Sequence, residues 1–545
     1  MTLEGSAAGT LDWEAIDWAE PRFADLTWEW DDMHSPRALR RLQQSYLELL
    51  NAGMNVRPAR LGLPIRTHLA VVNGYVFFAQ TIDGSPEERA AVLERAMAAR
   101  RAEIPTVGAW WRDEAKPEAI RLYEEVDGLP ASASGPDELA AAWERAWAIA
   151  DRIWEIHFQV IVGSYESLDV LVDAVRSAGI DAGDAEILGL AAGAVDELAD
   201  VEAGLAHLAS LVAADPELAA RLRTAPPSTI EELAALPSGA DVARAVEAFL
   251  ADHGHLGHLT EDLGEPSWRE QPARLLADVA IRSVDDASAV RDRRSSREVA
   301  ARELETRIRA ELAGRPAELE TFERSLGAAR EVGWLTEGHN YWLDRMCGDR
   351  LRRFVRRIAP SLVATGVITD RDDIFDLSRE EIGPLLRQPA DRRDVVAERQ
   401  AAHALRSAVT PPRTLGKAPE QQDPDTADRF DGARFVSTDA GVLRGTGASA
   451  GVVRSVARVV EGPADFDRVR RGDIVVARAS NPGWVPLFAI AGGFITDTGG
   501  VLAHAAVVAR EYGVPAVVGT GDATSRIRDG QIVELDGSTG FVRLG

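Results

Sequence analysis

The stretch TDTGGVLAHAAVVAREYGVPAVVG, residues 496–519, is the clearest guide to fold and chemistry in this chain. A small, apolar, helix-like segment begins at His504, shortly after the pair Gly499-Gly500. Glycines allow backbone conformations that a Cβ forbids, so their N–H groups can turn toward one point. The first N–H groups of a helix also lack partners within the helix, and the helix dipole favours negative charge there. The pattern therefore predicts an anion site with an imidazole beside it.

An imidazole at such a site is suited to attack on a phosphoryl group, because the same N–H groups can then hold the phosphohistidine. Asp497 is the candidate to orient the ring of His504, and Gly513 and Pro515 are expected to end the helix. Glycine geometry alone does not distinguish this hypothesis from a histidine that caps the helix or packs in the core. The longer pattern has to decide between them.

The region around this stretch, residues 436–545, consists of short β-rich runs separated by glycine turns. The expected helix at His504 interrupts these runs. They predict a compact α/β domain. Residues 410–435 are polar, contain prolines and lack periodicity, which predicts a flexible linker. Residues 1–409 carry apolar residues mainly at helical spacing. We therefore expect a large, mainly α-helical domain followed by a linker and a small C-terminal domain.

One part of the helical region departs from this pattern. The segment RTHLAVVNGYVFFAQ places an Asn-Gly pair, residues 73–74, between two β-rich runs. Asn-Gly supplies the two positive φ angles that a two-residue hairpin turn requires. The sequence predicts a small β-hairpin element within the helical domain.

The composition is that of an ordinary globular protein, with 46% hydrophobic and 27% charged residues. The net charge of −26 argues against nucleic acid or anionic membranes as partners, because both bind basic surfaces. A single cysteine, Cys347, excludes an intrachain disulfide, and it is expected to be an inert core thiol. The N-terminal segment lacks the basic and apolar regions of a signal peptide, and no apolar run approaches the roughly 18–20 residues of a membrane span. We expect a cytoplasmic protein.

The 24-residue stretch at 496–519 closely resembles the signature of the phosphohistidine, or swivelling, domain of phosphoenolpyruvate (PEP)-utilising enzymes. The flanking segments SNPGWVPLF and IRDGQIVELDGSTGFVRL also fit. One departure is Ala503, where the family usually has Ser or Thr before the histidine. The resemblance implies that His504 is phosphorylated and that Thr496, Gly499 and Gly500 help to form its site. The matching positions are Thr496, Gly499, Gly500, His504, Ala505, Ala509, Arg510, Glu511, Gly513, Pro515 and Gly519.

In that family the swivelling domain carries phosphate between two sites, one of which is commonly an ATP-grasp domain. ATP-grasp domains grip nucleotide phosphates with lysines as well as arginines. The chain has only two lysines, Lys116 and Lys417, among 61 basic residues, and neither lies on an expected strand. We find no glycine-rich phosphate loop near the N-terminus, and the sequence stops at the swivelling domain, where a pyruvate-binding barrel would otherwise follow. We therefore expect the nucleotide site, with Mg²⁺ and ATP, on a separate ATP-grasp subunit, and no cofactor bound firmly by this chain.

The helical region shows a second resemblance. The segments FLADHGHLGHLTEDLGEPSWREQP, EGHNYWLDRMCGDRLRRFVRRI and GVITDRDDIFDLSREEI resemble the acceptor-binding region of the rifampicin phosphotransferase and phenylphosphate synthase group. Two-component phenylphosphate and p-cresol phosphate synthases join an acceptor domain to the phosphohistidine domain in one subunit. The resemblance implies transfer from phosphohistidine to a hydroxyl, most simply of a phenol such as p-cresol. The overall reaction would convert ATP, water and the acceptor to AMP, phosphate and an aryl phosphate.

A hydroxyl acceptor requires a general base within about 3 Å and cationic groups for the moving charge. His253 or His255, in the segment HGHLGH that also contains His258, is one candidate base, and polar residues bordering a loop are an equal alternative. Histidine clusters also bind zinc, but no further ligand set is evident, so the sequence predicts no metal site. The second candidate set comprises His339, Asn340, Asp344, Arg345 and Arg352 in EGHNYWLDRMCGDRLRRF. Charged helix faces that are merely solvated are the alternative there.

The aromatic residues offer either a pocket for a ring or ordinary core packing, and core packing is the default. Two rival functions keep the phosphohistidine. One is a degenerate pyruvate-water dikinase that uses pyruvate or PEP; the other is a non-catalytic phosphocarrier or sensor. Labelling from PEP would distinguish the first rival. The aromatic candidates are Trp28, Trp30, Trp334, Tyr341 and Trp342.

Overall fold

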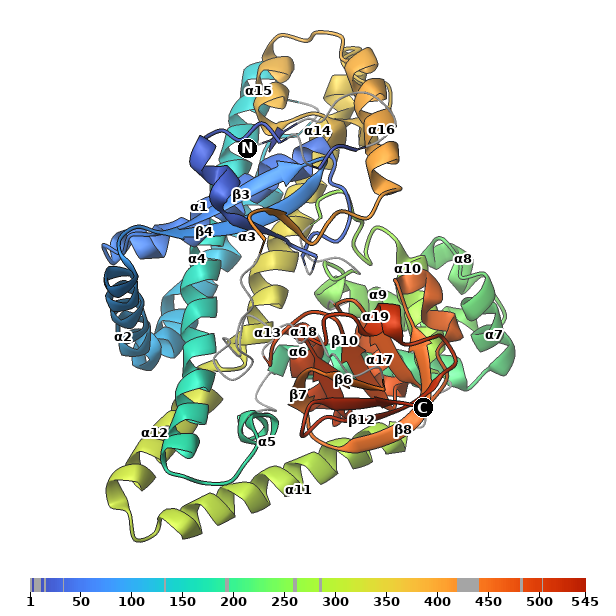
Figure 1. The fold of residues 1–545 in the computed structure, drawn as a ribbon. Coiled ribbons are helices and arrows are strands. Elements are labelled where there is room, and N and C mark those ends of the chain that lie inside the picture. Colours follow the sequence, from blue (N-terminus) through green and yellow to red (C-terminus); the bar gives the residue numbers. More distant parts are fainter. Residues whose placement is uncertain are drawn as a thin grey trace. The chain divides into compact units, whose positions relative to one another are not determined.

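Figure 1 shows the fold of the protein in a computed structural model. The chain forms two compact units. The first unit comprises residues 1–162, 260–266 and 339–421, and the second comprises residues 163–259, 267–338 and 422–545. The predicted fold class is confirmed: mainly helical regions with a β-hairpin element are joined to a C-terminal α/β domain. The structure describes the chain except for residues 1, 4–10, 14–15, 33, 132–133, 192–195, 258–261, 284–286, 419–440, 481–483 and 502.

The first unit combines helices with a five-stranded sheet of order β1-β3-β4-β2-β5. Its strands are β1 (Thr2–Leu3), β2 (Thr27–Trp30), β3 (Ile65–Val72), β4 (Tyr75–Ile82) and β5 (Thr414–Gly416). Its helices are η1 (Pro21–Asp25), α1 (Arg41–Arg60), α2 (Pro86–Trp110), η2 (Trp111–Ala115), α3 (Lys116–Gly128), η3 (Asn340–Arg345), α14 (Met346–Ala364), η4 (Arg371–Asp376), α15 (Arg379–Arg387) and α16 (Arg393–Ser407). The long helix α4 (Pro136–Ser177) contributes residues to both units.

The predicted hairpin is confirmed as strands β3 and β4. Val72 pairs with Tyr75, and the two residues between them have positive φ, 51° at Asn73 and 83° at Gly74. This combination matches the two-residue turn that Asn-Gly favours. Part of the segment predicted to be a linker also joins this sheet, because β5 pairs with β2. The remainder of that segment, from residue 419 onward, lies outside the described residues.

The second unit contains the C-terminal α/β domain and helices that precede it in sequence. These helices are α5 (Asp184–Gly189), α6 (Asp196–Ala213), α7 (Pro216–Thr224), α8 (Ile230–Ala234), α9 (Gly239–His253), α10 (Pro272–Arg282), α11 (Ala287–Leu312), α12 (Pro316–Val332) and α13 (Leu335–His339). The helices of the α/β domain are η5 (Pro463–Arg468), α17 (Val485–Ile490), α18 (His504–Tyr512) and α19 (Ala523–Arg526). The domain boundaries expected from the sequence stay a prediction.

The C-terminal sheet has eight strands in the order β6-β13-β12-β8-β9-β10-β11-β7. Strands β8 to β11 run parallel to one another, and the outer pairs are antiparallel. The strands are β6 (Val442–Arg444), β7 (Thr446–Ser449), β8 (Val452–Val459), β9 (Ile474–Ala477), β10 (Gly493–Thr496), β11 (Ala516–Val518), β12 (Ile532–Asp536) and β13 (Phe541–Leu544).

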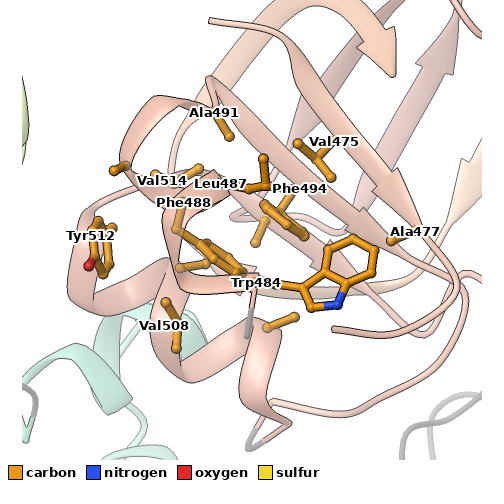
Figure 2. Packing of buried hydrophobic residues seen from close by; sticks show 14 of the residues in the cluster. Val475, Ala477, Trp484, Leu487, Phe488, Ala491, Phe494, Val508, Tyr512 and Val514 are labelled. Carbon is orange, nitrogen blue, oxygen red and sulfur yellow. The ribbon is translucent and has the colours of Figure 1, made fainter. Parts of the chain in front are cut away.

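Strands β9 and β11 are buried on both faces, which explains their uninterrupted apolar sequences. Successive residues of β9 face opposite layers: Val475 packs with α17 and α18, whereas Ile474 packs with α19. In the first layer, Phe488 of α17 stacks on Phe494 of β10 with ring centroids 3.9 Å apart (Figure 2). This layer packs against helix α18 and so holds its first residue, His504, in place.

Within the second unit, helices from the middle of the chain pack against the α/β domain. Helices α10 and α11 contact α17 and α18, respectively. Val501, in the loop before α18, belongs to a core cluster built mainly from residues 168–329. Arg297 of α11 donates a hydrogen bond to the carbonyl of Arg510 at 2.7 Å. The loop that carries His504 is therefore held between the sheet and these helices.

None of the described helices combines the length and the apolar composition that crossing a membrane requires.

Candidate active site

The loop before His504 follows the carboxyl end of a central parallel strand. Strand β10 ends at Thr496, and α18 begins at His504. Gly499 has φ of +102°, and a Cβ built on it would lie 2.8 Å from the Cβ of Ala503. Ligand sites in α/β sheets gather at the carboxyl ends of parallel strands, where helix N-termini point their N–H groups outward. The predicted glycine turn and helix start are both present.

His504 is buried and its ring is held by a carboxylate. Its Nδ1 atom lies 3.1 Å from Oε2 of Glu337, in α13. Both side chains are less than a tenth exposed. The other ring nitrogen, Nε2, is buried and has no hydrogen-bond partner among the residues that the structure describes.

This arrangement selects one chemical role for each ring nitrogen. A carboxylate beside Nδ1 accepts a hydrogen bond from it, which fixes the tautomer with the proton on Nδ1. The lone pair of the neutral ring then lies on Nε2. The nitrogen that lacks a partner is thus the one able to act as a nucleophile or to accept a proton.

The contact with Glu337 corrects the expectation that Asp497 orients the ring. Both carboxylate oxygens of Asp497 accept hydrogen bonds from Thr524, one from its backbone N–H at 2.9 Å and one from its hydroxyl. These bonds tie the loop to the start of α19. The printed sequence could not reveal the Glu337 contact, because 167 positions separate the two partners.

Thr496 shapes the loop and makes no hydrogen bond to the imidazole. Its hydroxyl donates to the carbonyl of Thr498 at 2.7 Å, and its own carbonyl accepts from Thr520. Ala503 occupies the N-cap position of α18 and offers no side-chain cap. Hydrogen bonds therefore hold the loop in place, and the side chain of Ala503 caps none of the N–H groups at the start of α18.

Arg510, another matching position of the signature, has a structural role. Its side chain is buried and donates to the carbonyl of Ala448 at 2.9 Å. Burial lowers the pKa of Arg510 to about 10, so the group stays charged at neutral pH. This hydrogen bond fastens the far part of α18 to β7, and Gly513, with φ of +62°, ends the helix as expected.

In the first unit, two predicted acceptor-site residues come together with a third that the sequence analysis missed. Nδ1 of His157, on α4, lies 2.6 Å from Oδ1 of Asp344, and Nε2 of His339 lies 3.7 Å from Oδ2. All three side chains are buried. Burial alone would raise the pKa of Asp344, but His157 above all, and His339, hold that pKa below its ordinary value.

The other predicted residues of this set have different surroundings. Arg352 donates to the carbonyl of Leu263 at 2.6 Å and lies over the ring of Phe375, so it supports a neighbouring segment. Arg345 is buried, and Asn340 is half-buried. The alternative of a merely solvated helix face does not hold for Asp344, Arg345 and Arg352, because all three side chains are buried.

His253 and His255 belong to the second unit, whereas His339 and Asp344 belong to the first. His253 ends α9 and packs against Phe249, and burial lowers the pKa of its imidazole. His255 is buried. His258 lies outside the described residues. A base role for either described histidine stays a prediction.

The aromatic candidates divide between core packing and ring contacts. Trp28 and Trp30 belong to the core cluster beside the five-stranded sheet, in agreement with the default expectation. Tyr341 packs edge-on against Trp342, whose ring also lies 4.1 Å from Nζ of Lys116. Cys347 is buried, and burial raises the pKa of its thiol to about 12, which fits an inert thiol.

Two regions of the chain match known domain families. Residues 469–540 match the mobile domain of PEP-utilising enzymes, and residues 159–337 match the fourth domain of rifampicin phosphotransferase. The first match contains His504, and the second ends at Glu337. The hydrogen bond between these two side chains therefore joins the two matched domains within one compact unit.

The chain is also similar to several curated proteins. The chain is 31% identical to chondramide synthase cmdD of Chondromyces crocatus, over 97% of this chain and 14% of that protein. It is 26% identical to the uncharacterized phosphotransferase YvkC of Bacillus subtilis, over 78% of this chain and 51% of that protein. A rifampicin phosphotransferase of Streptomyces sp is 33% identical, over 62% of this chain and 39% of that protein.

The chain thus spans at most about half the length of these three relatives. Both predicted resemblances, to the mobile domain and to rifampicin phosphotransferase, are confirmed. The chain thus combines a region similar to the mobile domain of PEP-utilising enzymes, which contains His504, with a region similar to the fourth domain of rifampicin phosphotransferase, which ends at Glu337.

Proposed function

We propose that this chain is the phosphohistidine-carrying part of an ATP-dependent phosphotransferase. His504 accepts a phosphoryl group and passes it to the hydroxyl of a small acceptor, for which a phenol such as p-cresol is our choice. A separate ATP-grasp subunit supplies the phosphoryl group from ATP bound with Mg²⁺. The sum is ATP, acceptor and water converted to AMP, phosphate and an aryl phosphate.

The observation that carries the proposal is the state of the His504 ring. Nδ1 is paired with Glu337, while Nε2 is buried at a helix N-terminus without a hydrogen-bond partner among the described residues. A ring that only capped a helix or filled a core would gain from bonding both nitrogens, because a buried unpaired acceptor costs about 1–3 kcal/mol. A nucleophile must keep its lone pair available.

In the first step, Nε2 attacks the β-phosphorus of ATP and AMP leaves, so that the ring carries a pyrophosphoryl group. Water then attacks the terminal phosphorus, phosphate leaves, and one phosphoryl group remains on Nε2. The ring gains a positive charge while Nδ1 keeps its proton. Glu337 then accepts a charge-assisted hydrogen bond from Nδ1, which stabilises the phosphorylated imidazolium. In the second step, the acceptor oxygen displaces Nε2 from phosphorus, its proton passes to a base, and the neutral ring is restored.

The base that takes the acceptor proton belongs to the proposal too. His253 is our candidate, because burial lowers the pKa of its imidazole and so favours the neutral form that can accept a proton. The two transfers occur at different sites, so His504 must leave Glu337 to reach at least one of them. Such a movement depends on the segment that the sequence predicts to be a linker, most of which lies outside the described residues.

The test exploits the reversibility of the second step and needs no partner. The full chain is incubated with phenyl phosphate or p-cresyl phosphate and analysed by intact-protein and peptide mass spectrometry. We expect an acid-labile phosphoryl group on His504, and none in His504→Ala. His207→Ala is the matched control, since His207 is an exposed histidine on α6 that should not affect labelling.

Parallel incubations with PEP separate the proposal from the pyruvate-water dikinase alternative. Labelling from PEP and not from the aryl phosphates would overturn the phenol acceptor. Labelling of His504 by ATP with an ATP-grasp protein, without ester formation from any phenol or alcohol, would instead identify a phosphocarrier. An unlabelled His504 under all of these conditions would refute the phosphohistidine itself.

A further inference from the structure

The buried cluster of His157, His339 and Asp344 offers more than one hydrogen bond. Each side chain presents one ligand atom, and these atoms all lie within 4.8 Å of one another. Two elements supply them: α4 supplies His157, and the junction of α13 with η3 supplies the other two. Two imidazoles and one carboxylate form a ligand set suited to divalent transition metals.

The local backbone explains how His339 and Asp344 come to face the same point. These residues are five positions apart, and in a regular α-helix such residues point about 140° away from each other. Residues 340–345 instead form a π-turn, η3, in which hydrogen bonds span five residues. This widening brings side chains at spacing five toward the same side. π-turns of this kind interrupt α-helices mostly where a site requires them.

A hydrogen-bonded triad alone does not use all the polar atoms of this cluster. Oδ1 of Asp344 is bonded to His157, but Oδ2 is buried and has no hydrogen-bond partner among the residues that the structure describes. The distance of 3.7 Å from Oδ2 to His339 is too long for a hydrogen bond. It is, however, an ordinary separation for two atoms bound to one ion at about 2.0–2.2 Å each.

The burial of the cluster also suits a cation. Asp344 is buried, and its Oδ1 is hydrogen-bonded to His157 while its Oδ2 has no hydrogen-bond partner among the described residues. A buried carboxylate with an unpaired oxygen is costly unless a positive charge compensates it. A divalent ion supplies that charge.

We propose that His157, His339 and Asp344 bind a divalent transition-metal ion of the Zn²⁺ class. Binding replaces the hydrogen bond between His157 and Asp344, because the coordinating nitrogen must present its lone pair. Tetrahedral bonds of about 2.0–2.2 Å hold two ligand atoms about 3.3–3.6 Å apart, so the ligand atoms, which lie within 4.8 Å of one another, must move closer together on binding. Three protein ligands leave a coordination position for water or an acceptor oxygen, as in catalytic zinc sites.

The test measures metal binding by the full chain without any phosphoryl donor. The protein is treated with a chelator, exchanged into chelator-free buffer with excess Mg²⁺ to occupy weak acidic sites, and titrated calorimetrically with Zn²⁺. We expect one site per chain, and affinity weakened by about 100-fold or more in both Asp344→Asn and His157→Gln. His207→Gln, an exposed histidine variant, should bind like the wild type.

Titration with Co²⁺ gives a second measurement that does not depend on the variants. A site with imidazole nitrogen ligands should produce visible absorption bands that Zn²⁺ removes in a 1:1 competition. If Asp344→Asn does not fold, this spectrum and the His157→Gln titration decide. Wild-type protein that binds neither ion, or variants that bind as tightly as the wild type, would overturn the proposal and leave a hydrogen-bonded triad.

The metal proposal and the phosphotransferase proposal can fail separately. A chain that labels His504 but binds no Zn²⁺ loses only the metal site. A chain that binds Zn²⁺ through this cluster but never labels His504 loses only the phosphohistidine.

Discussion

Each unit of this protein buries an imidazole against a carboxylate, yet the two pairs differ in what they leave unpaired. In the second unit, Glu337 lies 3.1 Å from His504, and a ring nitrogen lacks a partner among the described residues. In the first unit, Asp344 lies 2.6 Å from His157 and beside His339, and a carboxylate oxygen lacks a hydrogen bond within the same described set. An available nitrogen suits a nucleophile, whereas an available oxygen between two imidazoles suits a cation.

The backbone around the two pairs also differs, and this difference favours an anion in one unit and a cation in the other. His504 lies at the N-terminus of a helix, where backbone N–H groups favour an anion such as a phosphoryl group. Asp344 lies in a π-turn within a helical region, close to two imidazoles that can give up protons to bind a metal. The same residue types therefore serve opposite charges, because the backbone around them differs.

Removing the nucleophile of the second unit should have the largest effect of all the changes. His504→Ala should reduce phosphoryl labelling to background, a loss of at least about 10³-fold, because no other group replaces the attacking nitrogen. Labelling is measured by mass spectrometry after incubation with an aryl phosphate. The circular dichroism spectrum should not change, and residual labelling at the wild-type level would contradict the assignment.

Removing the carboxylate of the first unit should act mainly on stability. Asp344→Ala should lower the free energy of unfolding by about 3–5 kcal/mol, because it leaves two imidazoles buried without their partner. Asp241→Ala, which breaks an exposed pair with Arg244, is the control and should change the free energy by less than about 0.5 kcal/mol. Urea unfolding followed by fluorescence measures both.

The loss of stability in Asp344→Ala should depend on pH. The pKa of Asp344 is lowered from 3.8 in the folded protein, so its ionisation stabilises the fold above that pH. This contribution is lost as the pH falls through the lower, folded-state pKa. The difference in unfolding free energy between wild type and Asp344→Ala should therefore narrow below about pH 4. A difference that stays constant down to pH 2 would exclude the ionised carboxylate.

Neutralising the carboxylate of the second unit should slow chemistry rather than unfold the protein. Glu337→Gln keeps an oxygen that can accept from Nδ1 but removes the charge that stabilises the imidazolium, so labelling of His504 should slow by about 10–100-fold. Glu320→Gln, at an exposed position of α12, is the control. An unchanged labelling rate in Glu337→Gln would mean that the observed contact does not assist the transfer.

Changing the glycine turn should have a moderate effect. Gly499→Ala places a Cβ at φ of +102° and 2.8 Å from the Cβ of Ala503. The strain should cost about 1–3 kcal/mol of stability and should disturb the helix start that holds His504. Gly314→Ala is the matched control, because its Cβ would meet nothing within 4 Å. Equal thermal unfolding midpoints for the two variants would contradict this reasoning.

Restoring a capping hydroxyl should give the smallest change. Ala503 is the N-cap of α18 and supplies no cap, so Ala503→Ser should stabilise the protein by about 1 kcal/mol. Differential scanning calorimetry measures the gain. A lower unfolding midpoint would show that the close approach of Gly499 leaves no room for the hydroxyl.

The sequence by itself determined the features that depend on neighbours along the chain. The Asn-Gly turn at residues 73–74, the helix that begins at His504, and its end at Gly513 follow from local backbone preferences. The signature around His504 is contiguous, so its residues could be recognised without a fold. The apolar strands of the C-terminal sheet could likewise be predicted, because both of their faces are buried.

Only the tertiary structure decided which distant groups meet. Glu337 and His504 are 167 positions apart, and His157 and Asp344 are 187 positions apart. No spacing rule connects such residues, because their approach depends on how helices pack and on a π-turn that changes which side chains share a side. Hydrogen bonding depends on distance in space, and for these pairs the folded chain alone sets that distance.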